Sequence, residues 1–147
     1  MTKRSTLEGI TVLIVDDNAE WRELLEEVLT GYGACVVTAE GGAEAIRIVR
    51  ETPPDALLSD ISMPEMDGYT LIRAIRELEE SRRATTNERP SLPAAAVTAL
   101  SSKEDRRRSV SAGFRFHVAK PVSIPELVTT VAALVGRPDC AGMAPLR

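Results

Sequence analysis

The chain has no long hydrophobic run, few cysteines and a single histidine. No apolar stretch approaches the ~18 residues that a membrane-spanning helix needs, so we expect no contact with a membrane. The first apolar run, residues 10–15, is too short for a signal peptide and ends in two aspartates. These absences favour a cytoplasmic protein.

The two cysteines have no spacing typical of a metal site or a disulfide framework. Cys35 lies in a strand-like run and Cys140 lies near the C-terminus, and we interpret them as one buried and one incidental thiol. The net charge of −4 gives no electrostatic reason to expect direct binding to nucleic acid.

The length of 147 residues suits one domain with a substantial core. Hydrophobic residues make up 44% and charged residues 27%, which is typical of a globular protein. No repeat, low-complexity tract or second domain is visible. We expect one domain over residues 9–136, an N-terminal extension or linker over 1–8, and a mobile tail over 137–147.

Short apolar runs alternate with longer amphipathic stretches, a pattern typical of parallel strands and helices in α/β proteins. The predicted strands are residues 10–15, 34–39, 55–59, 94–97 and 116–118. Residues 79–93 are polar and hold two prolines, so we expect a helix end and a long surface loop there. The sequence therefore predicts a doubly wound five-stranded parallel sheet with helices on both faces.

Polar residues follow four of the five predicted strands. They are Asp16 and Asp17 after the first strand, Asp60 after the third, Thr98 after the fourth and Lys120 after the fifth. Because the carboxyl ends of parallel strands lie at one edge of a sheet, we expect these side chains to converge on one small patch.

The three carboxylates of this patch suit a divalent metal. Mg²⁺ prefers oxygen ligands, and Asp17 and Asp60 are candidates for direct ligands, with Asp16 directing a bound water. The backbone carbonyl of Ser62 completes the expected protein ligands. Three crowded carboxylates raise one another's pKa, and a metal ion or an ammonium group relieves this.

The remaining groups suit a phosphoryl group. Lys120 offers a compact charge for one phosphoryl oxygen and Thr98 a hydroxyl for a second, while a metal ion would hold the third. Asp60 lies at the end of the middle strand and is the candidate nucleophile, because a carboxylate can form an aspartyl-phosphate.

Four motifs carry a resemblance to a known family. They are Val-Asp-Asp-Asn at residues 15–18, Leu-Leu-Ser-Asp-Ile-Ser-Met-Pro-Glu-Met-Asp-Gly at 57–68, Ala-Val-Thr-Ala at 96–99 and Val-Ala-Lys-Pro at 118–121. Together they resemble the receiver (response-regulator) domain of bacterial two-component signalling over about residues 9–136. The resemblance implies a flavodoxin-like fold with strand order 2-1-3-4-5.

The resemblance also implies a chemistry. Asp60 would accept a phosphoryl group from a phosphohistidine of a sensor histidine kinase or a histidine phosphotransfer domain. The cofactor would be Mg²⁺ (or Mn²⁺), held by Asp16, Asp17 and Asp60. Thr98 and Lys120 would contact the phosphoryl group. Such a module is not a turnover enzyme, because it catalyses only its own phosphorylation and dephosphorylation.

The resemblance also implies a conformational switch on phosphorylation, and it indicates which residues would move. The Thr98 hydroxyl moves toward the phosphoryl oxygen, and an aromatic side chain three positions before Lys120 turns inward. In this sequence that position holds His117, which departs from the aromatic residue of the family. Two interpretations of His117 stay open: it is the switch residue, or it is a histidine without a special role. The Lys120–Pro121 peptide bond is expected to be cis. An output partner is expected to bind the face made by the fourth helix, fifth strand and fifth helix.

Several alternatives stay open. A metal-dependent phosphohydrolase with an aspartyl nucleophile would need a carboxylate two positions after Asp60, where the chain has Ser62. A pseudo-receiver has little support because all five site residues are present. The charged fourth helix is either a solvated face or a docking site, and the apolar last helix has surface for a partner. Residues 7–9 and the loop near 85–93 are similar to receivers of hybrid sensor kinases, so the chain is either stand-alone or part of such a kinase.

Overall fold

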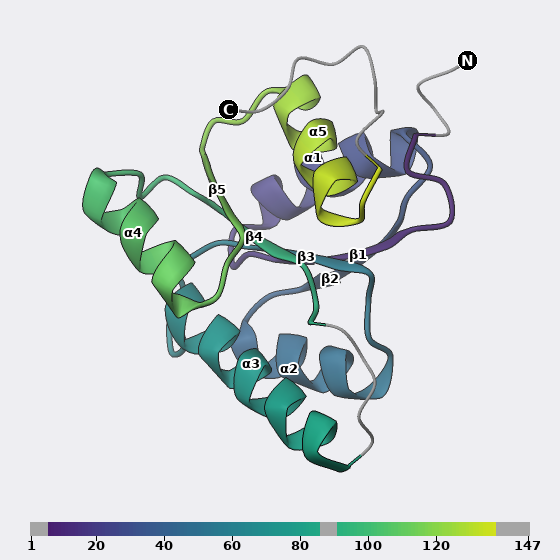
Figure 1. The fold of residues 1–147 in the computed structure, drawn as a ribbon. Helices are drawn as coiled ribbons and strands as arrows, with labels where there is room; N and C mark the ends of the chain where they lie inside the picture. The colour runs from purple at the N-terminus through teal and green to yellow at the C-terminus, as the bar shows by residue number, and fades with distance from the viewer. Residues whose placement is uncertain (1–5, 86–90, 138–147) are drawn as a thin grey trace.

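Five parallel strands form one central sheet in the computed structural model, which describes residues 6–85 and 91–137 (Figure 1). The strands are β1 (Thr11–Val15), β2 (Cys35–Ala39), β3 (Ala56–Ser59), β4 (Ala94–Thr98) and β5 (Phe116–Ala119). Their order is β2-β1-β3-β4-β5, which confirms the sequence prediction. Along the described residues, no helix has the length and apolar character that crossing a membrane requires.

One helix follows each strand. The helices are α1 (Ala19–Gly31), α2 (Gly42–Glu51), α3 (Gly68–Thr85), α4 (Lys103–Ala112) and α5 (Ile124–Leu134). In Figure 1, α1 and α5 cover one face of the sheet, α2 and α3 cover the other, and α4 lies beside the β4–β5 end. The expected doubly wound architecture is therefore present.

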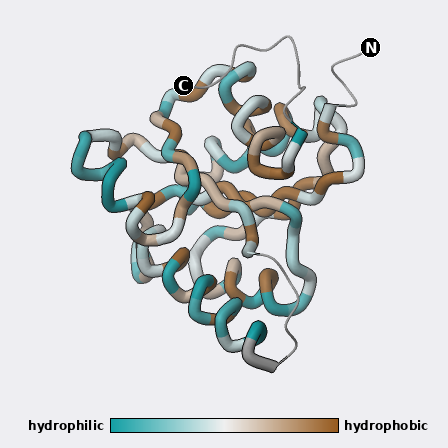
Figure 2. Tube along the Cα trace, in the orientation of Figure 1, coloured by the Kyte–Doolittle hydropathy of each residue, from teal (hydrophilic) through white to brown (hydrophobic). Residues whose placement is uncertain are grey.

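Alternate residues of the inner strands enter two separate cores. In β1, Leu13 and Val15 pack with the α2 and α3 side, whereas Val12 and Ile14 pack with the α1 and α5 side. Because both faces are covered, the inner strands are apolar at nearly every position (Figure 2).

The edge strand β2 differs from this pattern, and here one expectation was wrong. Cys35 was expected to be a buried thiol, but its side chain is exposed. The reason is its position at the start of an edge strand, where only Ala39 at the far end is buried. The expectation for Cys140 lies outside the described residues.

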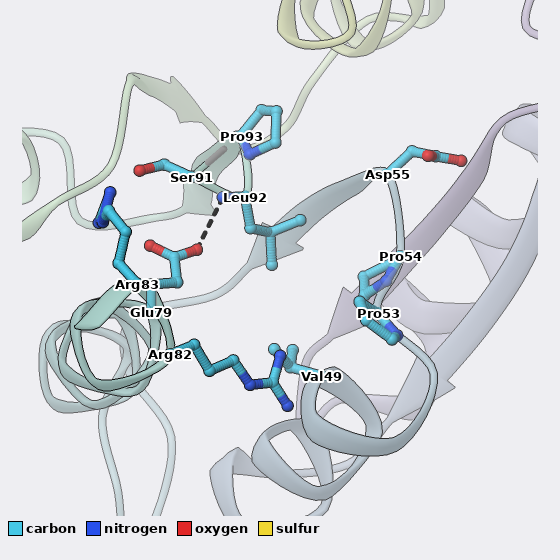
Figure 3. Close-up of a pocket in the computed structure, with 10 residues that line it drawn as sticks. All are labelled: Val49, Pro53, Pro54, Asp55, Glu79, Arg82, Arg83, Ser91, Leu92 and Pro93. Atoms are coloured by element: carbon cyan, nitrogen blue, oxygen red, sulfur yellow. Dashed lines mark hydrogen bonds between the residues drawn. The ribbon is translucent and has the colours of Figure 1, made fainter. Parts of the chain in front are cut away.

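Helix α3 is longer than the sequence analysis expected, since it continues through Thr85. Glu79, near the expected helix end, forms an ion pair with Arg76 at 2.9 Å. It also accepts a hydrogen bond of 2.7 Å from the Leu92 amide, which Figure 3 shows. This ties the second half of α3 to the start of β4. Residues 86–90 of the expected loop lie outside the described part of the chain.

The apolar residues of α5 are used inside the domain. Leu127, Val128 and Val131 are buried in the same core as α1, so little apolar surface of α5 is left for a partner, apart from Ile124, which is 48% exposed. The start of the described chain joins this core as well, because Leu7 is fully buried. The domain limits at residues 9 and 136, and the mobile tail, stay predictions.

Gly68 holds the loop after β3 close to the start of α3. Its amide donates a hydrogen bond of 2.8 Å to the Ile61 carbonyl oxygen. A Cβ atom at this position would lie 2.8 Å from Ile61 Cα and closer still to the Asp60 carbonyl oxygen, both of which are backbone atoms. The helix can therefore approach the loop only because residue 68 has no side chain.

We expect the substitution Gly68→Ala to lower the free energy of unfolding by about 1–3 kcal/mol, because the backbone must move to admit the new methyl group. Urea denaturation measures the effect. Gly31→Ala is the matched control, since nothing lies within 4 Å of a Cβ there and alanine favours the helix. Equal stability of Gly68→Ala and the wild type would contradict this view of the loop.

Candidate functional site

The three aspartates converge at the carboxyl ends of the neighbouring strands β1 and β3. Asp16 and Asp17 follow β1, Asp60 follows β3, and the two strands pair up to Val15 and Ser59. Each aspartate offers a carboxylate oxygen, and these three oxygens lie within 4.8 Å of one another. Asp16 and Asp60 are buried, while Asp17 is exposed at the mouth of the site.

The turn from β1 into α1 fixes Asp16. Its Oδ1 accepts a hydrogen bond of 2.9 Å from the Asn18 amide, and its backbone carbonyl accepts one of 2.8 Å from Arg22 Nη1. Asn18 in turn caps α1, because its side chain accepts a hydrogen bond from the Trp21 amide. The aspartate and the first turn of the helix therefore form one unit.

The two carboxylate oxygens of Asp60 have different surroundings. Oδ1 accepts hydrogen bonds from the backbone amides of Ile61 at 2.6 Å and Ser62 at 3.4 Å. Oδ2 instead faces the Lys120 ammonium at 3.5 Å. The backbone therefore orients the carboxyl group so that Oδ2 is presented to the site.

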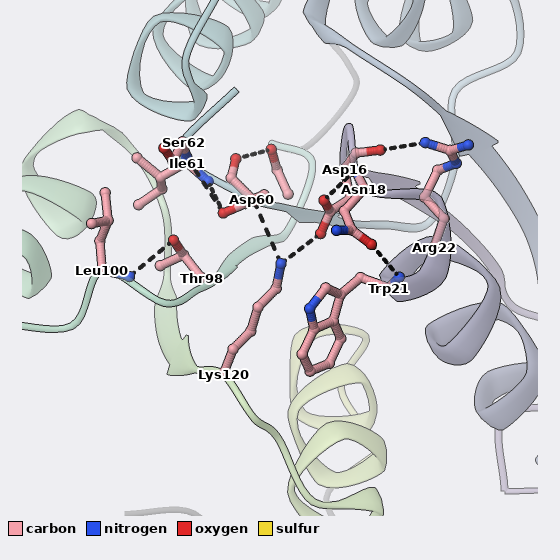
Figure 4. A network of polar contacts seen from close by, with 11 residues as sticks. Asp16, Asn18, Trp21, Arg22, Asp60, Ile61, Ser62, Thr98, Leu100 and Lys120 are labelled. Atoms are coloured by element: carbon pink, nitrogen blue, oxygen red, sulfur yellow. Dashed lines mark hydrogen bonds and ion pairs between the residues drawn. The ribbon is translucent and has the colours of Figure 1, made fainter. Parts of the chain in front are cut away.

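Lys120 reaches the aspartates from the end of β5 (Figure 4). Its Nζ lies 2.8 Å from Asp16 Oδ2 and 3.5 Å from Asp60 Oδ2, and its side chain is only 9% exposed. The backbone amide of Lys120 donates to the Thr98 carbonyl oxygen, which extends the β4–β5 pairing. The Lys120–Pro121 peptide bond is cis.

The charges of the site do not balance. Three carboxylates meet one ammonium, which leaves an excess of two negative charges. Burial raises the pKa of Asp16 above its usual value and the charge of Asp60 adds to this, although the contacts with Lys120 and the Asn18 amide oppose it. Carboxylate oxygens are the ligands that Mg²⁺ prefers, so the residues present fit a divalent cation of this kind.

A cleft of about 380 Å³ opens over these groups. Its lining residues are Asp17, Asn18, Trp21, Asp60, Ser62, Thr98, Ala99, Leu100 and Lys120. Thr98 is fully buried, and its Oγ1 accepts a hydrogen bond of 3.2 Å from the Leu100 amide. Ser62 is exposed at the rim. The cleft thus places a hydroxyl and an ammonium beside the carboxylate of Asp60.

His117 belongs to β5 and is not among the residues that line this cleft, and its side chain contacts α4. Its Nδ1 is 2.7 Å from Ser109 Oγ and its Nε2 is 2.7 Å from the Leu100 carbonyl oxygen. A carbonyl oxygen only accepts hydrogen bonds, so the neutral ring carries its proton on Nε2 and accepts from the Ser109 hydroxyl. Leu100 therefore connects His117 to Thr98.

Burial and charged residues of α4 together set the pKa of His117. Burial lowers the pKa of His117 below its ordinary value of 6.5, and the charge of Arg106 lowers it further. The hydrogen bond to Leu100 and the charge of Asp105 act in the opposite direction but do not cancel the effect of burial.

The structure brings most of the candidates together and adds others. The cleft contains Asp17, Asp60, Ser62, Thr98 and Lys120. Asp16 does not line it but contacts Lys120. Sequence reasoning assigned Trp21 only to the apolar face of α1 and overlooked Leu100 and Ser109. Trp21 had a usable signal, since a residue three positions after the capping Asn18 lies at the same end of the helix as the aspartates.

Comparison with known proteins gives a consistent result. The family model described as the response regulator receiver domain matches residues 12–132. An uncharacterised 14.6 kDa protein of Leptolyngbya boryana is 38% identical over 86% of this chain and 90% of its own length. The transcriptional regulatory protein PrrA of Mycobacterium bovis is 36% identical over 88% of this chain. The match covers 52% of PrrA, so the chain spans about half of that relative.

Solved structures agree with the family model. The receiver domain of the sensor histidine kinase PA1611 from Pseudomonas aeruginosa is 31% identical, with a TM-score of 0.75 over 87% of this chain and 98% of that one. That crystal structure has a magnesium ion coordinated in the active site cleft. The chemotaxis response regulator CheY4 of Vibrio cholerae is 27% identical, with a TM-score of 0.72 over 85% of this chain and 98% of that one.

We expect His117 to titrate below 6.5 as the Nε2–H tautomer, because burial disfavours its charged form. Between the folded and the unfolded pKa the unfolded chain binds more protons, so acidification through this window lowers stability. His117 is the only histidine, so its NMR signals are unambiguous in a pH titration, with the chain in denaturing urea as the control. A folded midpoint equal to or above the denatured one would refute the expectation.

Proposed function

Because this chain belongs to the response regulator receiver domain family of two-component systems, we propose that Asp60 is its phosphoacceptor. The observation that carries the proposal is the orientation of the Asp60 carboxyl group. Two backbone amides hold Oδ1, whereas Oδ2 faces the cleft beside the Lys120 ammonium. This is the arrangement that an oxygen nucleophile with a neighbouring counter-charge requires.

The transfer is an in-line displacement at phosphorus. Asp60 Oδ2 donates an electron pair to the phosphorus atom of a phosphohistidine, an O–P bond forms and the P–N bond breaks. The imidazole of the donor leaves with the electron pair and takes up a proton. The Lys120 ammonium and the Thr98 hydroxyl then donate hydrogen bonds to phosphoryl oxygens.

The acidic residues around Asp60 would hold a cation. Asp16, Asp17, Asp60 and the backbone carbonyl of Ser62 would hold Mg²⁺ or Mn²⁺, which supplies positive charge against the phosphoryl oxygens when bound. The excess negative charge of the three carboxylates supports this assignment. Without such a cation, an incoming phosphoryl group would meet a negatively charged cleft.

We assign the switch to Thr98 and His117. Thr98 Oγ1 accepts from the Leu100 amide, and the Leu100 carbonyl accepts from His117. If the Thr98 hydroxyl turns toward a phosphoryl oxygen, the bond to Leu100 is lost and the loop that holds His117 is released. A second cleft, of about 440 Å³, lies beside His117 between β5, α4 and the start of α5. We propose this face for the output partner.

The phosphodonor in this proposal is a sensor histidine kinase or a histidine phosphotransfer domain in the cytoplasm. The relatives support both a stand-alone module and one part of a longer regulator or kinase. A phosphohydrolase has weaker support, because the position two residues after Asp60 holds Ser62, whose hydroxyl is a poor general acid and base at neutral pH.

A phosphorylation assay tests the role of Asp60. We expect the wild type to gain one phosphate from acetyl phosphate and Mg²⁺, and Asp60→Asn to gain none, because the amide is not a nucleophile. Intact mass spectrometry detects the adduct. Asp55→Asn is the matched control, since Asp55 is an exposed aspartate that lies before β3, at the opposite edge of the sheet. Equal phosphorylation of Asp60→Asn and the wild type would rule out the proposed acceptor.

A metal titration tests the acidic cluster. Trp21 is the only tryptophan and lines the cleft, so its fluorescence should change as Mg²⁺ binds. Asp17→Asn should weaken the apparent affinity at least about tenfold, because a charged ligand is lost. Glu20→Gln removes a charge from an exposed residue nearby and should have little effect. The assignment fails if the two variants bind Mg²⁺ equally well.

A further inference from the structure

The indole ring of Trp21 lies against the ammonium group of Lys120. Nζ is 4.7 Å from the ring centroid, which is within the range of a cation–π contact. In Figure 4 the ring stands beside the end of the lysine side chain, on the side away from Thr98. The indole therefore helps to cover a lysine that is only 9% exposed.

The position of the indole is fixed by the first turn of α1. The Trp21 amide donates a hydrogen bond of 3.0 Å to the side chain of the capping residue Asn18. The ring is half-buried and packs against the core formed with α1 and α5. The adjacent Arg22 donates to the backbone carbonyl of Asp16, so the helix end and the acidic turn are joined on both sides.

The Lys120 ammonium contacts Asp16, Asp60 and the indole of Trp21. The proposed reaction would weaken the first two contacts but not the third. Asp16 and Asp60 attract it as carboxylates, at 2.8 and 3.5 Å. Both belong to the cluster that a cation would share, and the Asp60 carboxylate loses its charge when its oxygen is phosphorylated. The indole is neutral and offers no ligand to a hard cation. Its attraction for the ammonium therefore remains when the carboxylate contacts weaken.

We propose that Trp21 is a positioning residue that keeps the Lys120 ammonium directed into the cleft during phosphoryl transfer to Asp60. The inference rests on the function proposed above and adds a residue to it. The ring acts through Lys120 and does not contact the reacting atoms. By excluding water from one side of the ammonium, it also strengthens the interaction of Lys120 with anionic oxygens.

Two substitutions separate the aromatic face from simple packing. Trp21→Phe keeps a π face, whereas Trp21→Leu keeps only apolar bulk. With acetyl phosphate and saturating Mg²⁺, we expect phosphorylation to be about fivefold slower in Trp21→Leu and within about twofold of the wild type in Trp21→Phe. Leu24→Ala, on the same helix and 46% exposed, is the control that should leave the rate unchanged. Intact mass spectrometry follows the rates.

A second measurement needs neither metal nor phosphorylation. The chain has only three lysines, Lys3, Lys103 and Lys120, so carbon-13 labelling of lysine gives a simple NMR spectrum. We expect the ε-methylene protons of Lys120 to be shifted upfield by the ring current of the indole. Trp21→Leu should abolish this shift, and the loss of the signal in Lys120→Arg assigns it.

The outcomes are distinct. Normal phosphorylation of Trp21→Leu, or equal slowing of both Trp21 variants, would overturn the proposal, and so would a lysine spectrum without an upfield signal in the wild type. A wild type that never gains a phosphate would instead overturn the proposed function of Asp60. In that case the lysine spectrum still decides whether the indole holds the ammonium.

Discussion

The whole site depends on the crowding of three carboxylates around one buried ammonium. Asp16, Asp17 and Asp60 repel one another, and Lys120 compensates only one of their charges. Burying such groups is costly unless each one is paired and hydrogen-bonded. The backbone amides that hold one oxygen of Asp16 and one of Asp60 meet part of this requirement. The excess negative charge remains, and it fits the cleft to hold a divalent cation.

The sheet supplies the rigidity that this crowding needs. β1 and β3 pair directly, so their aspartates cannot separate without breaking the ladder, and both strands are anchored in two apolar cores. Lys120 follows β5, an edge strand of the sheet, and its side chain reaches Asp16 at the end of β1. This ion pair links two strands that are not neighbours in the sheet. The close approach at Gly68 fixes the chain that follows Asp60. Stability and site geometry therefore rest on the same contacts.

Much of this arrangement could be predicted because local chemistry and topology agree. Apolar runs predict the strands, and parallel pairing predicts that their carboxyl ends share one edge. Asp60 and Thr98 come directly after two of the predicted strands, so their place in the site could be predicted as well. What could not be predicted depends on tertiary context. Cys35 is exposed because β2 lies at the sheet edge, and the hydrogen bond from the Leu92 amide to Glu79 joins residues that lie 13 positions apart in the sequence. No one-dimensional pattern shows that the indole of Trp21 would meet Lys120, which is far away in the sequence.

If His117 takes part in the proposed switch, its hydrogen bonds distinguish it from an aromatic side chain at the same position. A phenylalanine at this position has no hydrogen bond to lose when it turns inward, and a tyrosine has one polar group. The imidazole is bonded at both ends, to Ser109 on α4 and to the carbonyl of Leu100. Each such bond contributes roughly 0.5–1.5 kcal/mol, so the two bonds together hold the ring between Ser109 and Leu100. Because the Leu100 amide also donates to Thr98 Oγ1, a movement of the Thr98 hydroxyl would weaken the restraint on the ring. In the proposed switch, the histidine would therefore stabilise the unphosphorylated conformation, and its release would depend on the hydrogen bond between Leu100 and Thr98.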